Sequence, residues 1–296
     1  MYRAERAGTY GASSYDAEVP QGPDAPHVTS PKNPMVMALA RLKQRRARAK
    51  TRTFLVEGTR EATRALSSGV PAKGLLLCPE LVTDADGATL VRAMAETAGV
   101  PVTTLSATAF ARLSMREHPD GVVLHARISR REPDDVKLGP DALVLVIDGL
   151  QKPGNVGALL RTADAVGVDA VFVTGDGTDL ENPNVIRASM GSVFAVTASA
   201  GTIEQIAARV RAAGLALVAT APTARRAHWD LDLTRGVAFV IGEEHAGLSD
   251  AWLDLADERV RIPMRADVAD SLNASVAGAV VLYEALRQRT QARSSV

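Results

Sequence analysis

The 296-residue sequence predicts an α/β protein in two domains, because short aliphatic runs alternate with helical segments along most of the chain. Apolar residues make up 46% of the sequence but aromatic residues only 4%, so mainly Ala, Val and Leu must build the core. This composition suits a parallel sheet, whose strands are buried on both faces. A charged stretch around Pro133, residues 130–135, interrupts the alternation and indicates a domain boundary.

The first 32 residues are rich in Gly, Ser, Pro and charged residues, and we expect a disordered tail over residues 1–32 because they cannot bury enough apolar surface to fold. A small α/β domain then spans residues 33–130. Its pattern predicts, in order, a helix from about residue 33 that enters a basic stretch, a strand at 54–56, a helix at 59–68, a strand at 74–78, a helix at 88–98, a strand at 100–105, a helix at 107–113 and a strand at 121–128.

After a linker at residues 131–141, a second α/β domain spans residues 142–296. Its expected strands lie at 143–147, 170–173, 215–220, 237–241 and 260–262. Its expected helices lie at 155–166, 202–213 and from Leu272 to near the end of the chain. Glycines at positions 167 and 214 favour a helix end in each case, because glycine adopts the left-handed conformation readily.

Composition excludes several classes of site and partner. The formal net charge is zero, so overall electrostatics predict no partner, and any affinity for nucleic acid must come from local charge. Cys78 is the single cysteine, which excludes an internal disulfide and an all-cysteine metal site, and its apolar surroundings indicate a core position. No metal-ligand cluster, membrane-length apolar segment or signal peptide is visible. We therefore expect a cytoplasmic protein with no membrane partner and no metal.

Cations are concentrated in residues 41–52, a segment that contains no acid. Like charges packed this closely repel one another unless an anion meets them, and nucleic-acid phosphates are the obvious anions. The alternative is a solvated helix face, although ordinary exposed helices interleave charges of both signs. The sequence thus predicts an RNA-binding surface formed by Arg41, Lys43, Arg45, Arg46, Arg48, Lys50 and Arg52.

Three stretches of the second domain carry the candidate chemistry. The first, residues 148–162, follows a buried strand and opens a helix, so its backbone amides face a cleft. It lacks the Gly-Lys-Ser/Thr of a P-loop, and Gly154 and Gly157 do not fit the dinucleotide fingerprint. Arg161, about a turn and a half into this helix, could reach a phosphate or a reacting oxygen; otherwise it forms a surface ion pair, for instance with Asp164.

The second stretch, residues 239–249, runs from an apolar strand into Gly242 and two adjacent acids, at the end of a strand where open α/β sheets bind ligands. The third stretch, residues 262–275, contains Ser271 and Asn273 just before the last helix. Either residue could simply cap that helix. Ile262, Met264 and Leu272 would offer apolar edges to a flat ring.

Taken in this order, the three stretches resemble the signature of the SpoU family of RNA ribose methyltransferases, in the SPOUT superfamily. The matching residues are Asn155-x-Gly157-x-x-x-Arg161-Thr162, then Ile241-Gly242-x-Glu244 ahead of Gly247-Leu248-Ser249, then Ile262-Pro263-Met264 and Ser271-Leu272-Asn273-x-Ser275. Glu244 matches the usual glutamate, and Glu243 fills the variable position. The resemblance covers residues 143–289, and residues 34–128 resemble more weakly the substrate-binding domain that often precedes it.

The resemblance implies a parallel sheet with a trefoil knot, a homodimer with the terminal helix in its interface, and S-adenosylmethionine as the methyl donor. Apolar surface for the dimer would come from Val276, Val280, Val281 and Tyr283. By motif position, the residues of the cofactor pocket would be Thr220, Gly242, Ile262 and Leu272, while Asn155, Glu244, Ser271 and Asn273 would orient the ribose and hold the loops. Because an arginine side chain stays protonated, we expect Arg161 to stabilise negative charge on the reacting oxygen.

Other functions remain open from the sequence. One is a nucleotide-dependent α/β enzyme that uses the Gly154–Gly157 loop for phosphate, although no acidic ribose-binding residue follows at the usual spacing. Another is a non-catalytic RNA-binding protein that retains the fold. A separate RNA-binding domain favours ribosomal RNA over transfer RNA as the substrate, and a transfer RNA methyltransferase is the alternative.

Overall fold

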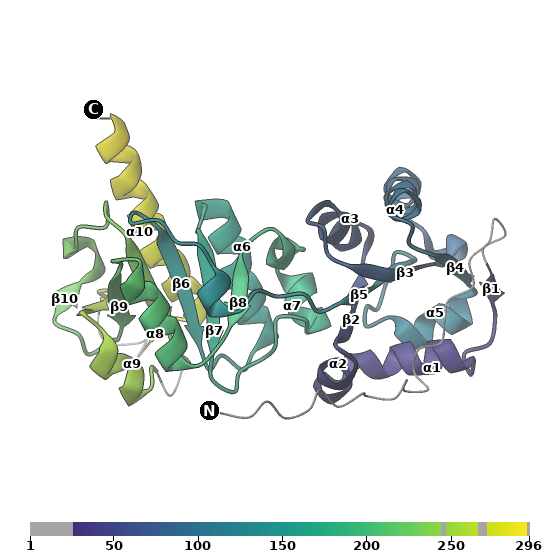
Figure 1. Cartoon of the computed structure of the whole chain (residues 1–296), viewed down its shortest axis with the longest axis horizontal. Helices are drawn as coiled ribbons and strands as arrows, with labels where there is room; N and C mark the ends of the chain where they lie inside the picture. The colour runs from purple at the N-terminus through teal and green to yellow at the C-terminus, as the bar shows by residue number, and fades with distance from the viewer. Residues whose placement is uncertain (1–25, 244–246, 266–270, 295–296) are drawn as a thin grey trace, which may run out of the picture.

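Two β-sheets, each covered by helices on both faces, lie in the N-terminal and C-terminal halves of the chain (Figure 1). The structure is a computed structural model and describes residues 26–243, 247–265 and 271–294. We refer to the two halves as the N-terminal domain and the C-terminal domain. A parallel-sheet domain preceded by a smaller α/β domain is what the sequence predicts, and this part of the prediction is confirmed.

The N-terminal sheet has five strands in the order β1-β4-β3-β5-β2. Strands β1, β4 and β3 are parallel, whereas β5 runs antiparallel to both of its neighbours, β3 and β2. The strands are β1 (His27–Val28), β2 (Thr53–Glu57), β3 (Ala72–Leu77), β4 (Val102–Leu105) and β5 (Val122–Arg127).

Alternate residues of the N-terminal strands pack against opposite helical layers. Helices α3 and α4 cover one face of the sheet, and α1 and α5 cover the other (Figure 1). In β3, Leu75 and Leu77 face the first layer, and Leu76 faces the second, as period-2 alternation requires. Cys78 is fully buried in the second layer, as predicted, and burial raises the pKa of its thiol. The helices are α1 (Pro34–Ala40), α2 (Arg45–Thr51), α3 (Thr59–Ser67), α4 (Ala85–Thr97) and α5 (Ala107–Leu113).

The C-terminal sheet has seven strands, all parallel, in the order β10-β12-β9-β11-β6-β7-β8. Its two central strands, β6 and β11, are buried along their whole length, as the aliphatic runs predict. The strands are β6 (Leu143–Asp148), β7 (Ala170–Thr174), β8 (Ala198–Ala200), β9 (Ala216–Thr220), β10 (Arg226–Ala227), β11 (Val237–Ile241) and β12 (Glu258–Arg261).

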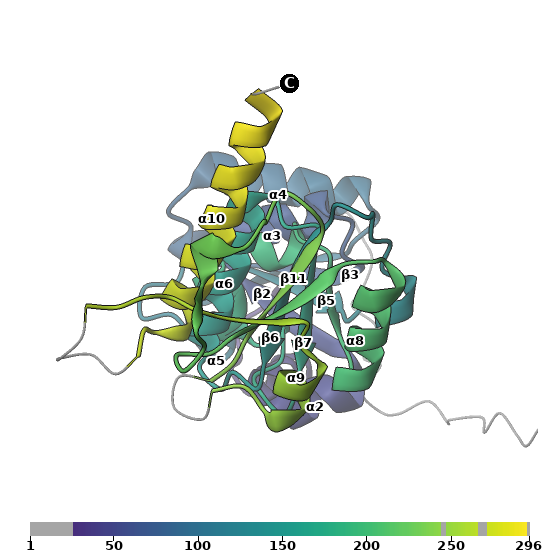
Figure 2. The ribbon, with the colours of Figure 1, turned by 90° about the vertical axis from the view of Figure 1, so that its left-hand side faces the viewer.

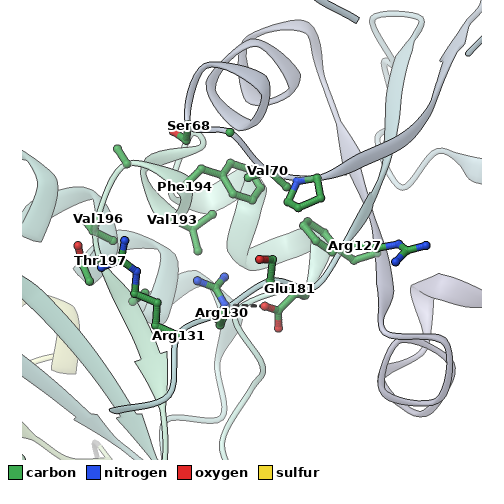
Figure 3. A pocket seen from close by; sticks show the side chains of 16 residues that line it. Ser68, Val70, Arg127, Arg130, Arg131, Glu181, Val193, Phe194, Val196 and Thr197 are labelled. Carbon is green, nitrogen blue, oxygen red and sulfur yellow. Dashed lines mark hydrogen bonds and ion pairs between the residues drawn. The ribbon is translucent and has the colours of Figure 1, made fainter. Parts of the chain in front are cut away.

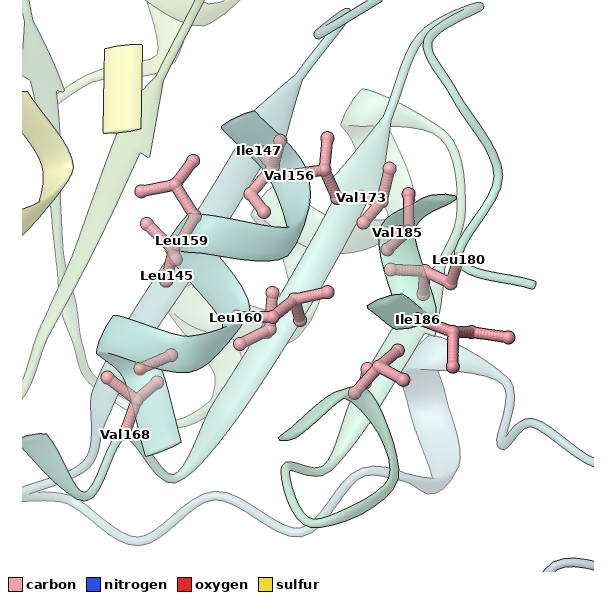
Figure 4. Close-up of a cluster of buried hydrophobic side chains, with 14 of the residues drawn as sticks. Leu145, Ile147, Val156, Leu159, Leu160, Val168, Val173, Leu180, Val185 and Ile186 are labelled. Atoms are coloured by element: carbon pink, nitrogen blue, oxygen red, sulfur yellow. The ribbon is translucent and has the colours of Figure 1, made fainter. Parts of the chain in front are cut away.

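Helices α6 and α10 cover one face of this sheet, and α8 and α9 cover the other (Figure 2). Helix α7 packs on the same face as α6. Leu145 and Ile147 of β6 point toward α6, where they meet Val156, Leu159 and Leu160 (Figure 4). Helix α6 begins at a proline and ends before a glycine in the left-handed conformation, which explains both of its boundaries. The helices are α6 (Pro153–Val166), α7 (Pro183–Ala188), α8 (Ile203–Ala212), α9 (Asp250–Leu255) and α10 (Ala274–Ser294).

A continuous apolar core joins the two domains. The ring of Phe54 in β2 stacks on Phe194 with 6.1 Å between centroids, a contact that contributes about 1 kcal/mol beyond the buried area. The predicted linker packs against the C-terminal domain, with Pro133 and Val136 buried and the Arg131 carbonyl accepting from Ser199 Oγ at 2.6 Å. A pocket of about 260 Å³ lies at this junction, where Arg130 contacts Glu181 (Figure 3). The segment at 131–141 is thus docked on the C-terminal domain.

The structure differs from the predicted elements at several short segments. Residues 27 and 28, assigned to the disordered tail, form β1 and pair with β4, because two backbone contacts at a sheet edge need no apolar run. The sequence pattern also missed α7, α9, β8 and β10, which have two to six residues each, too few to show a helical or strand period. The trefoil knot remains a prediction from the family resemblance.

Candidate functional site

A pocket of about 620 Å³ lies at the carboxyl ends of β9, β11 and β12. Thr220 ends β9, Gly242 follows β11, and Ile262 follows β12; Leu272 reaches the pocket from the segment before α10. Because the sheet is parallel, these strand ends meet at one edge although they are far apart in the sequence. All four predicted cofactor residues line this pocket, and their role in binding remains a prediction.

Close backbone approach shapes the loop beside the pocket. A Cβ atom on Gly242 would lie 2.3 Å from the carbonyl oxygen of Gly247, so only glycine fits there. Two backbone hydrogen bonds of 3.0 Å, one in each direction, join Glu243 to Gly247. On the other side, Thr220 Oγ1 donates to the Val240 carbonyl at 2.9 Å. The close backbone approach and these hydrogen bonds therefore fix the edge of the pocket.

The chemistry of the pocket walls suits S-adenosylmethionine. Its volume falls within the range of about 300–1,000 Å³ that is usual for small-molecule sites. Leu248, Leu253 and Met264 supply apolar surface for a flat ring, while Ser271 and the neighbouring backbone supply polar groups. Three residues that were not predicted as site residues also line the pocket, directly after β9: Ala221, Pro222 and Thr223. Their position directly after Thr220, at the end of a strand, is the signal that could have identified them.

A hydrogen bond joins the first and third predicted motifs. Asn273 Nδ2 donates to Asn155 Oδ1 at 3.1 Å, which connects the start of α6 to the start of α10. The Asn273 side chain also accepts from the backbone amides of Ser275 and Val276 at 3.0 and 3.4 Å, so it caps α10 as well. Helix capping, the simpler explanation for Asn273, is thus present together with the link to Asn155.

Arg161 lies on the exposed side of α6, and its side chain does not line the pocket of its own chain. Among the residues that the structure describes, none forms a hydrogen bond or ion pair with its guanidinium. Asp164, the alternative partner considered for it, lies 4.0 Å from Arg64 and accepts from Ser192 Oγ at 2.7 Å. Arg161 is therefore available to a ligand or to another chain. Glu244 lies outside the described residues.

The basic run divides into exposed and buried members. Arg41, Arg45, Arg46, Lys50 and Arg52 are exposed around α2. Lys43 is half-buried and donates to the Ser114 carbonyl at 2.7 Å, and burial lowers the pKa of its ammonium. The prediction that all seven cations face RNA is wrong for Arg48, whose side chain is 2% exposed and pairs with Asp179. A helix spreads consecutive residues around its axis, so one cation of the run points into the protein.

The last helix, α10, packs on α6 with one face and exposes apolar residues on another. A Cβ on Gly278 would lie 2.3 Å from Leu159 Cδ2, which shows how closely the two helices approach. Val276 and Tyr283 are about half exposed, at 48% and 51%. Val281 is fully buried in its own chain, so the expectation that it supplies dimer surface is wrong.

Two features are absent from the described parts of the chain. No group of three or more His, Cys, Asp or Glu residues there could hold a metal ion. No helix in residues 26–243, 247–265 and 271–294 has both the length and the apolar character needed to cross a membrane.

Comparison with known proteins identifies the family. The model of the SpoU rRNA Methylase family matches residues 142–283, and the model of the MRM3-like substrate binding domain matches residues 33–124. The 23S rRNA (uridine(2479)-2'-O)-methyltransferase of Streptomyces viridochromogenes is 32% identical over 92% of this chain and 96% of that protein. The chain belongs to the SpoU rRNA methylase family.

Other members of the SpoU family bear on the cofactor and on the substrate. The 23S rRNA (guanosine(2553)-2'-O)-methyltransferase RlmP of Bacillus subtilis is 32% identical over 86% of this chain and 97% of that protein. The crystal structure of an AdoMet-bound rRNA methyltransferase from Sinorhizobium meliloti superposes with a TM-score of 0.81 and 31% identity, covering 89% of this chain and 98% of that one. AdoMet is S-adenosylmethionine, so a solved SpoU relative binds the methyl donor that the motifs predict.

Proposed function

We propose that this SpoU family member transfers a methyl group from S-adenosylmethionine to a ribose 2'-hydroxyl in ribosomal RNA. The observation that carries the proposal is the pocket at the ends of β9, β11 and β12, which lies beside the hydrogen bond between Asn155 and Asn273. Relatives that match nearly the whole chain are named as 2'-O-methyltransferases of 23S rRNA, and one solved relative binds AdoMet.

In this proposal, the strand ends hold the methyl donor. Ile262 and Leu272 would supply apolar surface for its flat ring, and the backbone near Thr220 and Gly242 would supply hydrogen-bonding groups. When bound, S-adenosylmethionine supplies a sulfonium-activated methyl group, so the protein needs mainly to position the acceptor and stabilise charge. These pocket residues also exclude water from one side of the reacting centre.

The acceptor ribose is positioned by polar side chains near α6 and α10. Asn155, Asn273 and Ser271 orient the sugar, because the first two are already joined and Ser271 lines the pocket. Arg161 stabilises negative charge that develops on the 2'-oxygen and contacts the adjacent phosphate. Since a guanidinium does not give up its proton in proteins, Arg161 acts here as an electrostatic group rather than as a base.

The exposed cations around α2 bind the phosphates of the RNA, and Arg46 and Arg52 are the clearest members of this set because their exposed side chains form no hydrogen bond or ion pair among the described residues. Two relatives of similar identity are named for uridine and for guanosine, so family membership does not fix the base. The target nucleotide must therefore be selected by features of this chain and its RNA.

We propose further that the protein works in the cytoplasm as a homodimer with a knotted C-terminal domain, as the family resemblance implies. The exposed apolar face of α10, with Val276 and Tyr283, would lie in the dimer interface. Arg161 does not line the pocket of its own chain. In a dimer packed near α10, Arg161 of one chain would complete the pocket of the other, so that two chains form a composite site. Sedimentation of the purified protein at twice the chain mass would support the dimer, and a monomer would reject it.

Two measurements test the main proposal. Isothermal titration calorimetry should show one S-adenosylmethionine site per chain. Incubation of ribosomal RNA with S-adenosylmethionine that carries a labelled methyl group should then place the label on one ribose, detected as local resistance of the backbone to alkaline cleavage. No uptake of the cofactor, or label on a base with the sugar unmodified, would contradict the proposal.

A further inference from the structure

The acidic segment Asp179-Leu180-Glu181, between β7 and α7, is held by arginines from the N-terminal half of the chain. Arg48 of α2 pairs with Asp179. Arg130, just after β5, pairs with Glu181 (Figure 3). Between the two acids, Leu180 is buried in the shared core. The segment is thus held by an ion pair at each acid and by the burial of Leu180 between them.

The pair of Arg48 and Asp179 has the geometry of a rigid connection. Arg48 Nε donates to Asp179 Oδ1 at 3.0 Å, and Nη2 donates to Oδ2 at 2.5 Å, so the two groups meet through parallel hydrogen bonds. Arg48 Nη1 donates to the carbonyls of Leu42 and Lys43 at 2.9 and 3.0 Å. All three guanidinium nitrogens are therefore engaged, in a side chain that is only 2% exposed.

Neighbouring contacts continue to the loop that precedes α6, the helix that carries Asn155 and Arg161. Arg45 of α2 donates to the Gly177 carbonyl at 3.0 Å, two residues before Asp179. The next amide, that of Thr178, donates to the Leu150 carbonyl at 2.9 Å. Gln151 Nε2 donates to the Gly149 and Asp176 carbonyls at 3.2 and 3.3 Å. The chain of contacts thus runs from α2 to the loop at 149–152, which ends at the start of α6.

A largely buried ion pair is a poor way merely to attach two domains. The Arg48 side chain is 2% exposed and that of Asp179 19%, so the pair loses most of its contact with water at a cost in free energy that an apolar contact would not have. The shared core around Phe54 and Phe194 already joins the domains. What a bidentate arginine–carboxylate pair adds is a fixed direction and distance, because the planar guanidinium accepts its partner in one orientation. The pair lies between the basic surface and the loop that precedes α6, so its fixed geometry can position one relative to the other.

We infer that Arg48 and Asp179 are positioning residues that set the register between the RNA-binding surface of α2 and the active site, and so determine which ribose reaches the methyl donor. The inference rests on the proposed function. RNA held by the exposed cations of α2 would lie at a set distance from Asn155 because this pair, together with the hydrogen bond from Arg45 to Gly177, holds the helix against the segment at 176–181. Arg48 is buried, and neither residue lines the pocket at the ends of β9, β11 and β12.

The test compares Asp179→Asn with the wild-type full-length chain. Asparagine has one acceptor oxygen instead of two and no charge, so it cannot keep both parallel hydrogen bonds from Arg48, while all exposed cations remain. Displacement of the acceptor by about 1 Å can cost on the order of 100-fold in rate, so we expect the rate at saturating RNA to fall by about that factor. The dissociation constants for RNA and for S-adenosylmethionine should change less than about twofold, and mapping of ribose methylation should show label on neighbouring nucleotides.

Two more variants make the result decisive. Arg48→Lys keeps the charge but cannot form two parallel hydrogen bonds, so it should also slow the reaction and shift the methylated position. It decides the question if Asp179→Asn does not fold. Glu96→Gln, which removes the exposed ion pair with Arg92 on α4, is the matched control and should leave rate and position unchanged.

The outcomes separate the register from the proposed function itself. An active wild-type enzyme whose two variants keep the wild-type rate and position would overturn the register inference alone. Loss of RNA affinity in parallel with rate would also overturn it, because the pair would then serve binding. If the wild-type protein methylates no ribose, the proposed function is wrong, and the inference that rests on it is wrong with it.

Discussion

The proposed cofactor pocket is formed mostly by strand ends, backbone and aliphatic side chains, whereas the proposed RNA-binding surface around α2 is formed by the ends of long cationic side chains. In the pocket, Thr220, Gly242 and Ile262 are brought together by the sheet itself, because parallel strands end at one edge. Around α2, neighbouring cations diverge, and Arg48 points inward to Asp179. A site made by the fold should therefore respond to changes in shape, and a site made by side chains should respond to changes in charge.

Arg161→Ala gives the largest expected effect, because in the proposed function Arg161 belongs to neither region and acts only on the reacting centre. Methyl transfer should fall by about 10²- to 10³-fold, the usual loss when one group that stabilises transition-state charge is removed. Binding of S-adenosylmethionine should stay close to wild type, since Arg161 does not line the pocket. Single-turnover methylation and calorimetry measure the two quantities. Full activity in Arg161→Ala would exclude the proposed role.

Lowering the pH should reduce the folding stability of the N-terminal domain, which contains the proposed RNA-binding surface, through the buried His125 of β5. Burial, with Lys73 and Arg127 nearby, lowers the pKa of His125 to about 4, and its Nε2 has no partner among the described residues. In the unfolded chain the pKa is about 6.5, so the unfolded state binds more protons between these values. Stability from neutral His125 is thus fully present above about pH 6.5 and lost as pH falls to about 4, by about 3 kcal/mol.

Denaturant unfolding at several pH values measures this effect, and His125→Leu should flatten the curve between pH 6.5 and 4 relative to wild type. His228 in the C-terminal domain serves as the comparison. Burial lowers its pKa too, but Glu284 and Asp230 oppose that shift. His228→Leu should flatten the curve less than His125→Leu, and equal curves for His125→Leu and wild type would contradict the assignment.

The difference between a site made by strand ends and a site made by long side chains also explains how much of each the sequence could predict. The aliphatic runs predict the central strands β6 and β11, and strand ends with family motifs predict Gly242, Ile262 and Leu272 at one pocket. A charge run does not reveal which cation a helix turns inward, so the partnership of Arg48 with Asp179, 131 residues away, could not be predicted. The same holds for Val281, since an apolar helix residue packs equally well inside its chain or against another.

Gly242→Ala tests whether the pocket responds to shape. The added Cβ would lie 2.3 Å from the Gly247 carbonyl oxygen, so the loop must move. We expect the dissociation constant for S-adenosylmethionine to rise on the order of tenfold, equivalent to about 1.4 kcal/mol, with RNA affinity unchanged. Gly139→Ala is the matched control, because a Cβ added there would meet no atom within 4 Å beyond its chain neighbours, and its backbone is not left-handed. Wild-type cofactor affinity in Gly242→Ala would mean that the loop does not form the pocket edge.

The smallest expected effect concerns charge at the end of α2, where Arg52 has a left-handed backbone with φ of 51°. Glycine is the usual residue in this conformation, so a purely structural position would favour it by about 1 kcal/mol. Arg52→Gly and Arg52→Gln both remove the charge, but only the glycine relieves the backbone strain. We expect both variants to bind RNA more weakly and to lower the slope of log affinity against log salt by about 0.7–0.9.

Combining either variant with Arg46→Gln should lower that slope by about the same amount again, because Arg46 is a second exposed cation of α2. In thermal unfolding, Arg52→Gly should be more stable than Arg52→Gln by about 1 kcal/mol while binding RNA equally weakly. Such a result would show that the charge of Arg52 contributes to RNA binding, whereas its left-handed backbone lowers the stability of the protein. Arg235→Gln, which changes an arginine exposed far from α2, should leave the slope as it is in wild type. An unchanged slope in the Arg46 and Arg52 variants would mean that RNA binds elsewhere on the surface, and the fixed distance between α2 and the pocket would then have no part in selecting the ribose.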